Sequence, residues 1–213
     1  MNVKTLPLSS NCYIVSDDDG KTVIFDPAER GEEIYDYVKS QNLEVCAVII
    51  THAHFDHIYG LTGLVESAAQ DGKDIPVYIH TADAAAMYDS EKNLSAPLFR
   101  TPYRYTGILK GVCDGCEIKV GSMTFLVISA PGHTEGSACY VCHSGRAVFS
   151  GDVLFDGSIG RTDFPGGDMG KMKESLKRLM TVNKWYTVYP GHGGTTTIEQ
   201  EMNFNPYIAG LDL

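Results

Sequence analysis

Short apolar runs of strand length recur along the chain, and turn residues separate them. These runs are Cys12–Val15, Thr22–Phe25, Val45–Ile50, Val77–Ile79, Met123–Ile128, Ala138–Val141, Ala147–Phe149 and Thr187–Tyr189. Other stretches have apolar residues at the spacing that places them on one face of a helix. These stretches are Glu32–Lys39, Leu61–Ala69 and Lys171–Met180. Because strands interleaved with helices bury their apolar faces in shared layers, this pattern predicts an α/β fold.

The chain shows no break at which it would divide into separate domains. It has 213 residues, with no low-complexity linker, sequence repeat or long block of charge. We therefore expect a single domain over residues 1–213. From Ser90 to Gly107, two prolines, three aromatic residues and two arginines interrupt the regular patterns, which predicts a long loop or lid.

Charge and hydropathy limit the partners and the compartment. A net charge of -10 and a pI near 5.0 give no broad attraction for nucleic acid or anionic lipid, so we expect neither as a partner. No run approaches the roughly 18 apolar residues of a membrane span, and Met1–Val15 lacks a continuous signal-peptide core. The expected compartment is the cytoplasm, where the six cysteines would be free thiols.

The strongest chemical signal is the segment THAHFDH at residues 51–57, directly after the apolar run that ends at Ile50. If the extended geometry of that strand continues, His52 and His54 point to the same side. A turn can then fold Asp56 and His57 back toward them. Imidazole nitrogens and carboxylates are ligands that zinc accepts at about 2.0–2.2 Å, and iron or manganese can use them too. The segment therefore predicts a metal site.

Three later loops repeat this arrangement of a polar side chain just beyond an apolar run. The side chains are His133 after residues 127–130, Asp152 after residues 147–150 and His192 after residues 187–189. A glycine directly precedes each of them, and glycine permits tight turns and close approach of the backbone. We therefore expect one edge of a sheet to present all of these side chains to a shared point.

The order of the candidate ligands along the chain resembles the pattern of the metallo-β-lactamase superfamily. In that pattern the signature His-x-His-x-Asp-His precedes a distant His, a bridging Asp and a last His. The resemblance covers roughly residues 11–193 and implies an αβ/βα four-layer sandwich with a dinuclear site at one edge of its two sheets. It implies two divalent ions, most simply zinc, with iron or manganese as alternatives. The implied ligands are His52, His54 and His133 for the first ion, Asp56, His57 and His192 for the second, and Asp152 as a bridge.

Such a site implies hydrolysis. Two divalent ions about 3.5–4 Å apart supply hydroxide near neutral pH and polarise a substrate carbonyl. Asp56 would then be catalytic as well as a ligand, because its carboxylate can accept a hydrogen bond from the attacking water. Asp26, in another loop after a strand, is a candidate to orient an imidazole. The alternative is that Asp26 is only a turn residue before Pro27.

Two stretches, Gly151–Phe155 and Gly160–Phe164, are similar to the glyoxalase II-like branch of this superfamily. That resemblance implies a small-molecule thioester, such as a glutathione thioester, as the substrate. Arg161 would bind a substrate carboxylate through a bidentate contact, or would instead hold its own loop through Asp163. Long glyoxalase II proteins have a basic C-terminal region, whereas residues 197–213 contain neither lysine nor arginine, so an anionic substrate group would need another partner.

Other interpretations of the ligand pattern stay open. It is compatible with a persulfide dioxygenase that holds one iron ion, with a lactone-type hydrolase of the same superfamily, and with a non-catalytic metal-binding protein. Nucleases of the superfamily share the ligands, but the acidic charge balance gives that interpretation no support.

Two C-x-x-C spacings suggest a zinc ribbon at first sight. Cys139 and Cys142 lie in a strand-like run, where positions three apart face opposite sides, so one ion cannot bind both sulfurs. Cys113 and Cys116 lie in a turn-like segment with Gly115 and could form a local redox pair.

Overall fold

The computed structural model describes residues 1–212 and contains two six-stranded β-sheets. The first sheet has the order β1-β2-β3-β4-β5-β6, with strands β1 (Asn2–Pro7), β2 (Asn11–Ser16), β3 (Lys21–Phe25), β4 (Glu44–Ile49), β5 (Val77–His80) and β6 (Leu109–Val112). The second has the order β14-β13-β10-β9-β8-β7, with strands β7 (Glu117–Val120), β8 (Met123–Ser129), β9 (Ala138–Cys142), β10 (Ala147–Gly151), β13 (Thr187–Pro190) and β14 (Thr196–Thr197). A separate hairpin consists of β11 (Leu154–Phe155) and β12 (Ser158–Ile159).

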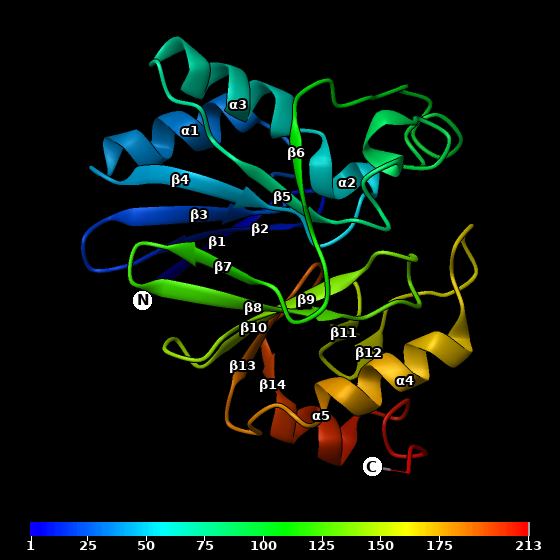
Figure 1. Cartoon of the computed structure of the whole chain (residues 1–213). Helices are drawn as coiled ribbons and strands as arrows, with labels where there is room; N and C mark the ends of the chain where they lie inside the picture. The colour runs from blue at the N-terminus through cyan, green and yellow to red at the C-terminus, as the bar shows by residue number, and fades with distance from the viewer. Residues whose placement is uncertain (213) are drawn as a thin grey trace.

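Helices cover the outer face of each sheet, and the two sheets face each other in the middle (Figure 1). The first sheet carries α1 (Gly31–Ser40) and α3 (Leu61–Gln70), and the second carries α4 (Met169–Leu179) and α5 (Ile198–Phe204). Two short turns of helix are α2 (Phe55–Ile58) and a 3-10 turn at Ala86–Tyr88. These four layers confirm the predicted αβ/βα sandwich. Within residues 1–212, no helix has both the length and the apolar character needed to cross a membrane.

The central strands bury both of their faces. Along β2, Tyr13 and Val15 join the core between the two sheets, whereas Cys12 and Ile14 join the core beneath α1 and α3. Successive side chains of a strand point to opposite faces, so each central strand contributes to two cores. This is why the strands read as continuous apolar runs in the sequence.

An aromatic cluster fills the core between the sheets. Phe25 of β3 stacks on Phe149 of β10 with ring centroids 4.1 Å apart, and Phe125 of β8 meets Phe25 edge-on at 5.4 Å. Truncating a buried phenylalanine of this kind to alanine costs about 3–5 kcal/mol. Because Asp26 and Asp152 lie just beyond Phe25 and Phe149 in the chain, this packing anchors the strand ends from which polar loops emerge.

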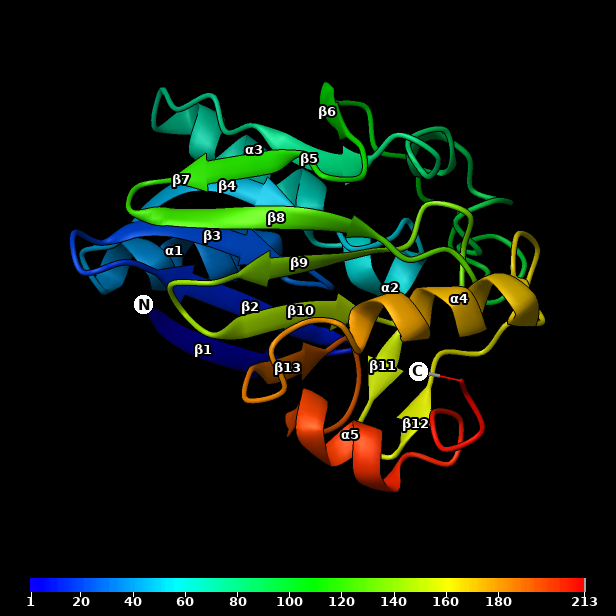
Figure 2. The same cartoon turned by 60° about the horizontal axis from the view of Figure 1, so that its bottom comes forward.

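Strands of both sheets end on one side of the molecule. β10 and β13 are parallel neighbours, and β8 runs in the same direction as β10 because both are antiparallel to β9. Figure 2 shows the arrowheads of β4, β8 and β10 at the same side. The loops that follow these strands therefore emerge together.

Every predicted strand and helix is present, with ends shifted by at most two residues. The elements that the sequence patterns did not predict are β1, β6, β7, β11, β12, β14, α2 and α5. β1 is a half-exposed edge strand, so no apolar run marks it. α5 carried a readable signal, since the Thr197 side chain caps it by accepting a hydrogen bond from the Gln200 backbone N–H at 3.1 Å, as in a capping box.

Candidate metal centre

The seven predicted ligand side chains meet on the side where these strands end. The loop after β4 supplies His52, His54, Asp56 and His57, and the loops after β8, β10 and β13 supply His133, Asp152 and His192. Their ligand atoms fall into three overlapping groups, with the atoms of each group within 4.8 Å of one another. The expectation of a single sheet edge was wrong. β4 belongs to the first sheet and the other three strands to the second, so the cluster spans the ends of both sheets.

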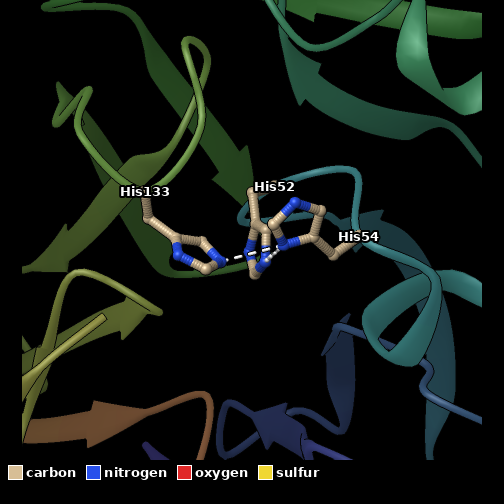
Figure 3. A group of neighbouring side chains, drawn as sticks. All are labelled: His52, His54 and His133. Atoms are coloured by element: carbon tan, nitrogen blue, oxygen red, sulfur yellow. Dashed lines mark hydrogen bonds between the residues drawn. The ribbon is translucent and has the colours of Figure 1, made fainter. Parts of the chain in front are cut away.

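Three buried imidazoles form the first part of the cluster, and Figure 3 shows their rings pointing toward one another. His54 Nδ1 lies 3.1 Å from His52 Nε2 and 2.9 Å from His133 Nε2. Two nitrogens that bind one tetrahedral zinc ion at 2.0–2.1 Å are about 3.3 Å apart. These two separations are therefore close to the edge of such a tetrahedron, and the ligand atoms of all three residues lie within 4.8 Å of one another. They also bear out the expectation that His52 and His54 point to the same side.

The second part of the cluster is formed by Asp56, His57 and His192. Asp56 Oδ2 lies 3.3 Å from His192 Nε2 and 3.9 Å from His57 Nε2. His57 is fully buried, whereas 39% of the His192 side chain is exposed. This part of the cluster is therefore open to solvent on the His192 side.

Asp152 lies between the two parts. Its Oδ2 atom is 3.5 Å from both His133 Nε2 and His192 Nε2, and its Oδ1 atom is 3.4 Å from His57 Nε2. A carboxylate in this position can contact cations on either side of it, which is the geometry that a bridging ligand needs.

Two atoms of the cluster test whether a metal fits. Among residues 1–212, His57 Nε2 and Asp152 Oδ1 are the buried side-chain nitrogen and oxygen atoms that have no hydrogen-bond partner. A buried polar atom without a partner is costly, and native structures satisfy nearly all of them. Both orphaned atoms are of ligand type and they face each other at 3.4 Å. A divalent cation would satisfy both, so the residues present fit a metal.

The protonation states also suit cation binding. Burial lowers the pKa of His54 to about 3, and burial together with the neighbouring imidazoles lowers the pKa of His52 well below its usual value. Both rings are therefore neutral near pH 7, as ligation requires. Burial alone would lower the pKa of His57, but the surrounding carboxylates, led by Asp152, raise it well above its usual value. This carboxylate environment favours a positive charge at His57, which a metal ion can supply in place of a proton.

Three imidazoles of the cluster each form a hydrogen bond through Nδ1, which leaves Nε2 directed toward the other ligands. His57 Nδ1 donates to Asp26 Oδ2 at 2.9 Å, and the Thr51 hydroxyl donates to the same oxygen at 2.7 Å. Because that hydroxyl has no second proton, its oxygen accepts from His52 Nδ1, 3.1 Å away. Asp26 thus has the geometry expected for orienting an imidazole, both directly and through Thr51. In the same way, His133 Nδ1 donates to the backbone carbonyl of Arg161 at 2.7 Å.

Asp83 supports the cluster, and the sequence patterns did not single it out. Its carboxylate accepts hydrogen bonds from the Ala53 N–H at 3.0 Å, the Thr134 hydroxyl at 2.8 Å and the Gly136 N–H at 2.7 Å. It therefore joins the loop of His54 to the loop after β8. The available signal was its position just beyond β5, a parallel neighbour of β4 whose end lies at the same side.

Asn11 was also missed, although it holds the loop that carries His192. Its side-chain amide donates to the backbone carbonyls of Pro190 at 3.0 Å and Gly193 at 2.9 Å. Gly191 in the same loop passes very close to the cluster, because a Cβ atom there would lie 2.1 Å from Asp152 Oδ1. Only glycine fits at that position, which explains the glycine before His192.

A cavity of 470 Å³ opens beside the cluster. Its remaining wall is largely apolar, and the apolar lining residues are Leu94, Leu98, Phe99, Phe155, Ile159 and Phe164. The first three belong to the segment from Ser90 to Gly107, which contains neither helix nor strand and so confirms the predicted long loop. The loop thus forms one side of the cavity that leads to the cluster.

Arg161 lines this cavity, but its guanidinium is already engaged. It makes two hydrogen bonds of 2.7 Å to the carboxylate of Asp163 and lies 3.8 Å from the centre of the Phe164 ring. The structure therefore contains the loop-holding contact that was the alternative to substrate binding. Both partners are more than half exposed, and an exposed ion pair contributes at most about 1 kcal/mol. A substrate carboxylate can therefore compete with Asp163 for Arg161.

This αβ/βα sandwich with its His and Asp cluster is the architecture of a metallo-hydrolase. The sequence profile of the metallo-beta-lactamase superfamily matches residues 5–192, and the chain belongs to that superfamily. It is 36% identical over 211 residues to the probable metallo-hydrolase YqgX of Bacillus subtilis, covering 97% of this chain and 96% of that protein. It is 30% identical over 217 residues to the hydroxyacylglutathione hydrolase GloC of Haemophilus influenzae, covering 98% of each, which supports the glyoxalase II-like branch.

Solved structures agree with this membership. The BLEG-1 B3 metallo-beta-lactamase superposes with a TM-score of 0.89 at 36% identity, over 98% of this chain and 100% of that one. TTHA1623 in a di-iron-bound form superposes with a TM-score of 0.83 at 34% identity, over 97% of this chain and 100% of that one.

Proposed function

We propose that the protein is a metal-dependent hydrolase of small thioesters, and that the seven clustered side chains hold two divalent ions. The observation that carries this proposal is the meeting of buried neutral imidazoles and two unsatisfied ligand atoms beside a cavity. His52, His54 and His133 would hold one ion, Asp56, His57 and His192 the other, and Asp152 would contact both. Zinc suits these donors, as do iron and manganese. The di-iron form of the similar TTHA1623 keeps iron among the candidates.

The bound ions would supply a hydroxide nucleophile near neutral pH and polarise the thioester carbonyl. The chain's own residues would position the reactants. Asp56 lines the cavity and part of its side chain is exposed, so its carboxylate can accept a hydrogen bond from the attacking water. The carbonyl carbon would then lie at the inner end of the cavity, next to His192 and Asp152.

The cavity wall indicates how a thioester would lie. Its apolar residues suit the acyl group or the alkyl part of the thiol, because they offer burial without hydrogen bonds. Arg161 is the cation at the rim and can bind a carboxylate of the thiol once it leaves Asp163. The relative named hydroxyacylglutathione hydrolase supports a glutathione-type thioester as the first substrate to assay.

A second candidate is a persulfide dioxygenase with a single iron ion. Two imidazoles and one carboxylate are the ligands of many non-haem iron oxygenases. His133 and His52 with Asp152 provide such a set, with Asp152 Oδ2 3.5 Å from His133 Nε2. Lactone hydrolysis would use the same cavity and the same ligands, so the assay has to include a lactone and a persulfide.

The test is hydrolysis of S-lactoylglutathione, with a lactone and a persulfide assayed beside it, by protein that is first stripped with a chelator and then reloaded with zinc, iron or manganese. We expect activity to disappear on stripping and to return with one of these metals. Asp152→Ala should stay folded, as judged by circular dichroism, and be inactive in every metal. The matched control is His143→Ala, because His143 bonds to Tyr186 outside the cluster. Full activity of stripped protein or of Asp152→Ala would exclude the proposed centre, and turnover of persulfide alone would favour the dioxygenase.

A further inference from the structure

Two cysteines lie in contact at the connection between the two sheets. Cys113 and Cys116 belong to the turn that joins β6 of the first sheet to β7 of the second. Their sulfur atoms are 2.8 Å apart, and Cys113 is exposed. The Cys116 N–H donates to the Cys113 carbonyl at 3.1 Å, and Gly115 supplies the positive φ of +74° that this turn requires. The turn therefore holds both thiols together at the surface.

The other cysteines provide a contrast within the same chain. Cys139 and Cys142 have the same spacing, but both are fully buried in β9. Cys139 joins the core beneath α4 and Cys142 joins the core between the sheets, as the strand alternation predicted. Identical spacing thus gives two thiols in contact, one exposed and one partly buried, in one place and two separated buried thiols in the other.

The sulfur atoms of Cys113 and Cys116 are close to bonding distance. A disulfide has an S–S distance of about 2.05 Å, so the sulfurs at 2.8 Å need to approach by only about 0.8 Å. The Cys113 backbone N–H also points at Cys116 Sγ at 3.3 Å, which stabilises negative charge there. The hydrogen bond from the Cys113 thiol and this N–H lower the pKa of Cys116, whereas the same thiol contact raises the pKa of Cys113.

We propose that Cys113 and Cys116 form a redox-active dithiol that exchanges with disulfides of low-molecular-weight thiols. The Cys116 thiolate attacks one sulfur of the disulfide and releases one small thiolate. Cys113, as its thiolate, then attacks Cys116 Sγ of the mixed disulfide, releases the second small thiolate and closes the protein disulfide. The dithiol loses two electrons and two protons, and the small disulfide gains them as two thiols.

The turn is bonded to the strand that leads to the metal cluster. Asp114 Oδ1 accepts from the Ser129 N–H at 2.9 Å, and Val127 exchanges backbone hydrogen bonds with Gly115 and Cys116, each of 2.9 Å. Ser129 ends β8, and the loop after β8 carries His133. Because the sulfurs are already in contact, ring closure leaves these hydrogen bonds in place, and we expect the metal content of the oxidised protein to be unchanged.

The test exposes the metal-loaded protein to glutathione disulfide under native conditions and quenches it with acid. Remaining thiols are blocked with N-ethylmaleimide after unfolding, and tryptic peptides are weighed. Trypsin separates the two C-x-x-C pairs into residues 111–119 and 120–146. We expect the first peptide to lack two hydrogens and to carry no maleimide, while the second carries two maleimides.

The variants separate the two chemical steps. In Cys113→Ser the exchange should stop at a stable glutathione adduct on Cys116, because no second thiol resolves it. Cys46→Ser is the control, since Cys46 is the remaining partly exposed cysteine, and it should behave as wild type. Two maleimides on the wild-type 111–119 peptide, or a lasting glutathione adduct there, would overturn the proposal. Neither outcome depends on which substrate the metal cluster hydrolyses.

Discussion

The two halves of the cluster are enclosed to very different degrees. His52, His54 and His133 are 1%, 6% and 3% exposed, whereas 39% of the His192 side chain and 21% of the Asp56 side chain are exposed. His54 and His133 line the same cavity as Asp56 and His192, and His57 is fully buried, so the difference in exposure comes from Asp56 and His192. We therefore expect the open half to lose its ion more easily than the buried half.

Different contacts support the two halves. Asp83 joins two loops of the buried half through three hydrogen bonds, and the Arg161 carbonyl fixes the His133 ring. On the open side, Asn11 donates to the Gly193 carbonyl and His57 donates to Asp26, but a Cβ atom at Gly193 or Gly194 would meet nothing within 4 Å. Both halves therefore have hydrogen-bonded support, and the open half also has free space beside the loop that follows His192.

Removing a ligand of the buried half should have the largest effect. His54 Nδ1 is the nitrogen that lies within 3.1 Å of both other imidazoles, so His54→Ala opens the first ion site. We expect thioester hydrolysis to fall by about 10³-fold or more, measured as kcat/KM on zinc-loaded protein. A rate within tenfold of the wild type, with the fold intact, would show that the buried imidazoles do not hold a catalytic ion.

Removing the exposed ligand should be less severe. His192→Ala leaves the buried half untouched, so we expect one ion to stay bound and the rate to fall by about 10²-fold through misplacement of the reactants. Titration of apoprotein with zinc would show one tight site in place of two. A loss as complete as that of His54→Ala would mean that the two halves do not act separately.

Asp26→Asn changes the support of the open half without removing a ligand. The amide would place a donor against His57 Nδ1, which now donates to Asp26 at 2.9 Å, and would favour the tautomer with the proton on Nε2. We expect metal affinity to fall by about 10- to 100-fold, with activity recovered at high zinc concentration. An unchanged metal affinity, measured by competition with a chelator, would show that Asp26 acts only as a turn residue.

The smallest effect should come from the cavity wall. Phe99 is 45% exposed and lines the cavity on the long loop, so Phe99→Ala removes apolar contact with the substrate and leaves the ligands in place. We expect KM to rise by about threefold to tenfold with little change in kcat. The matched control is Phe204→Ala, because Phe204 is an exposed phenylalanine at the end of α5 and does not line the cavity. An equal rise in KM for Phe204→Ala would show that Phe99 has no specific role in substrate binding.

The strands, the helices and the candidate ligands could be predicted because each has a local signal, whereas the four-layer arrangement was implied by the resemblance to the metallo-β-lactamase superfamily. His133 and His192 each follow an apolar strand and a glycine, and strand alternation correctly separated Cys139 from Cys142. Asp83 and Asn11 were missed because their roles come from hydrogen bonds across 30 to 182 positions of the chain, which no local pattern records. The sequence does not decide whether Arg161 contacts Asp163 or a substrate, because two side chains two positions apart can pair or diverge.

Metal stoichiometry tests the central claim most directly. Wild-type protein and His192→Ala would be stripped, reloaded with zinc, freed of excess metal and measured by elemental analysis against protein concentration. The proposed function predicts two zinc ions per wild-type chain and one per His192→Ala chain. Wild-type protein that retains no zinc, or a variant that retains as much as the wild type, would contradict the proposal that these side chains bind a pair of ions.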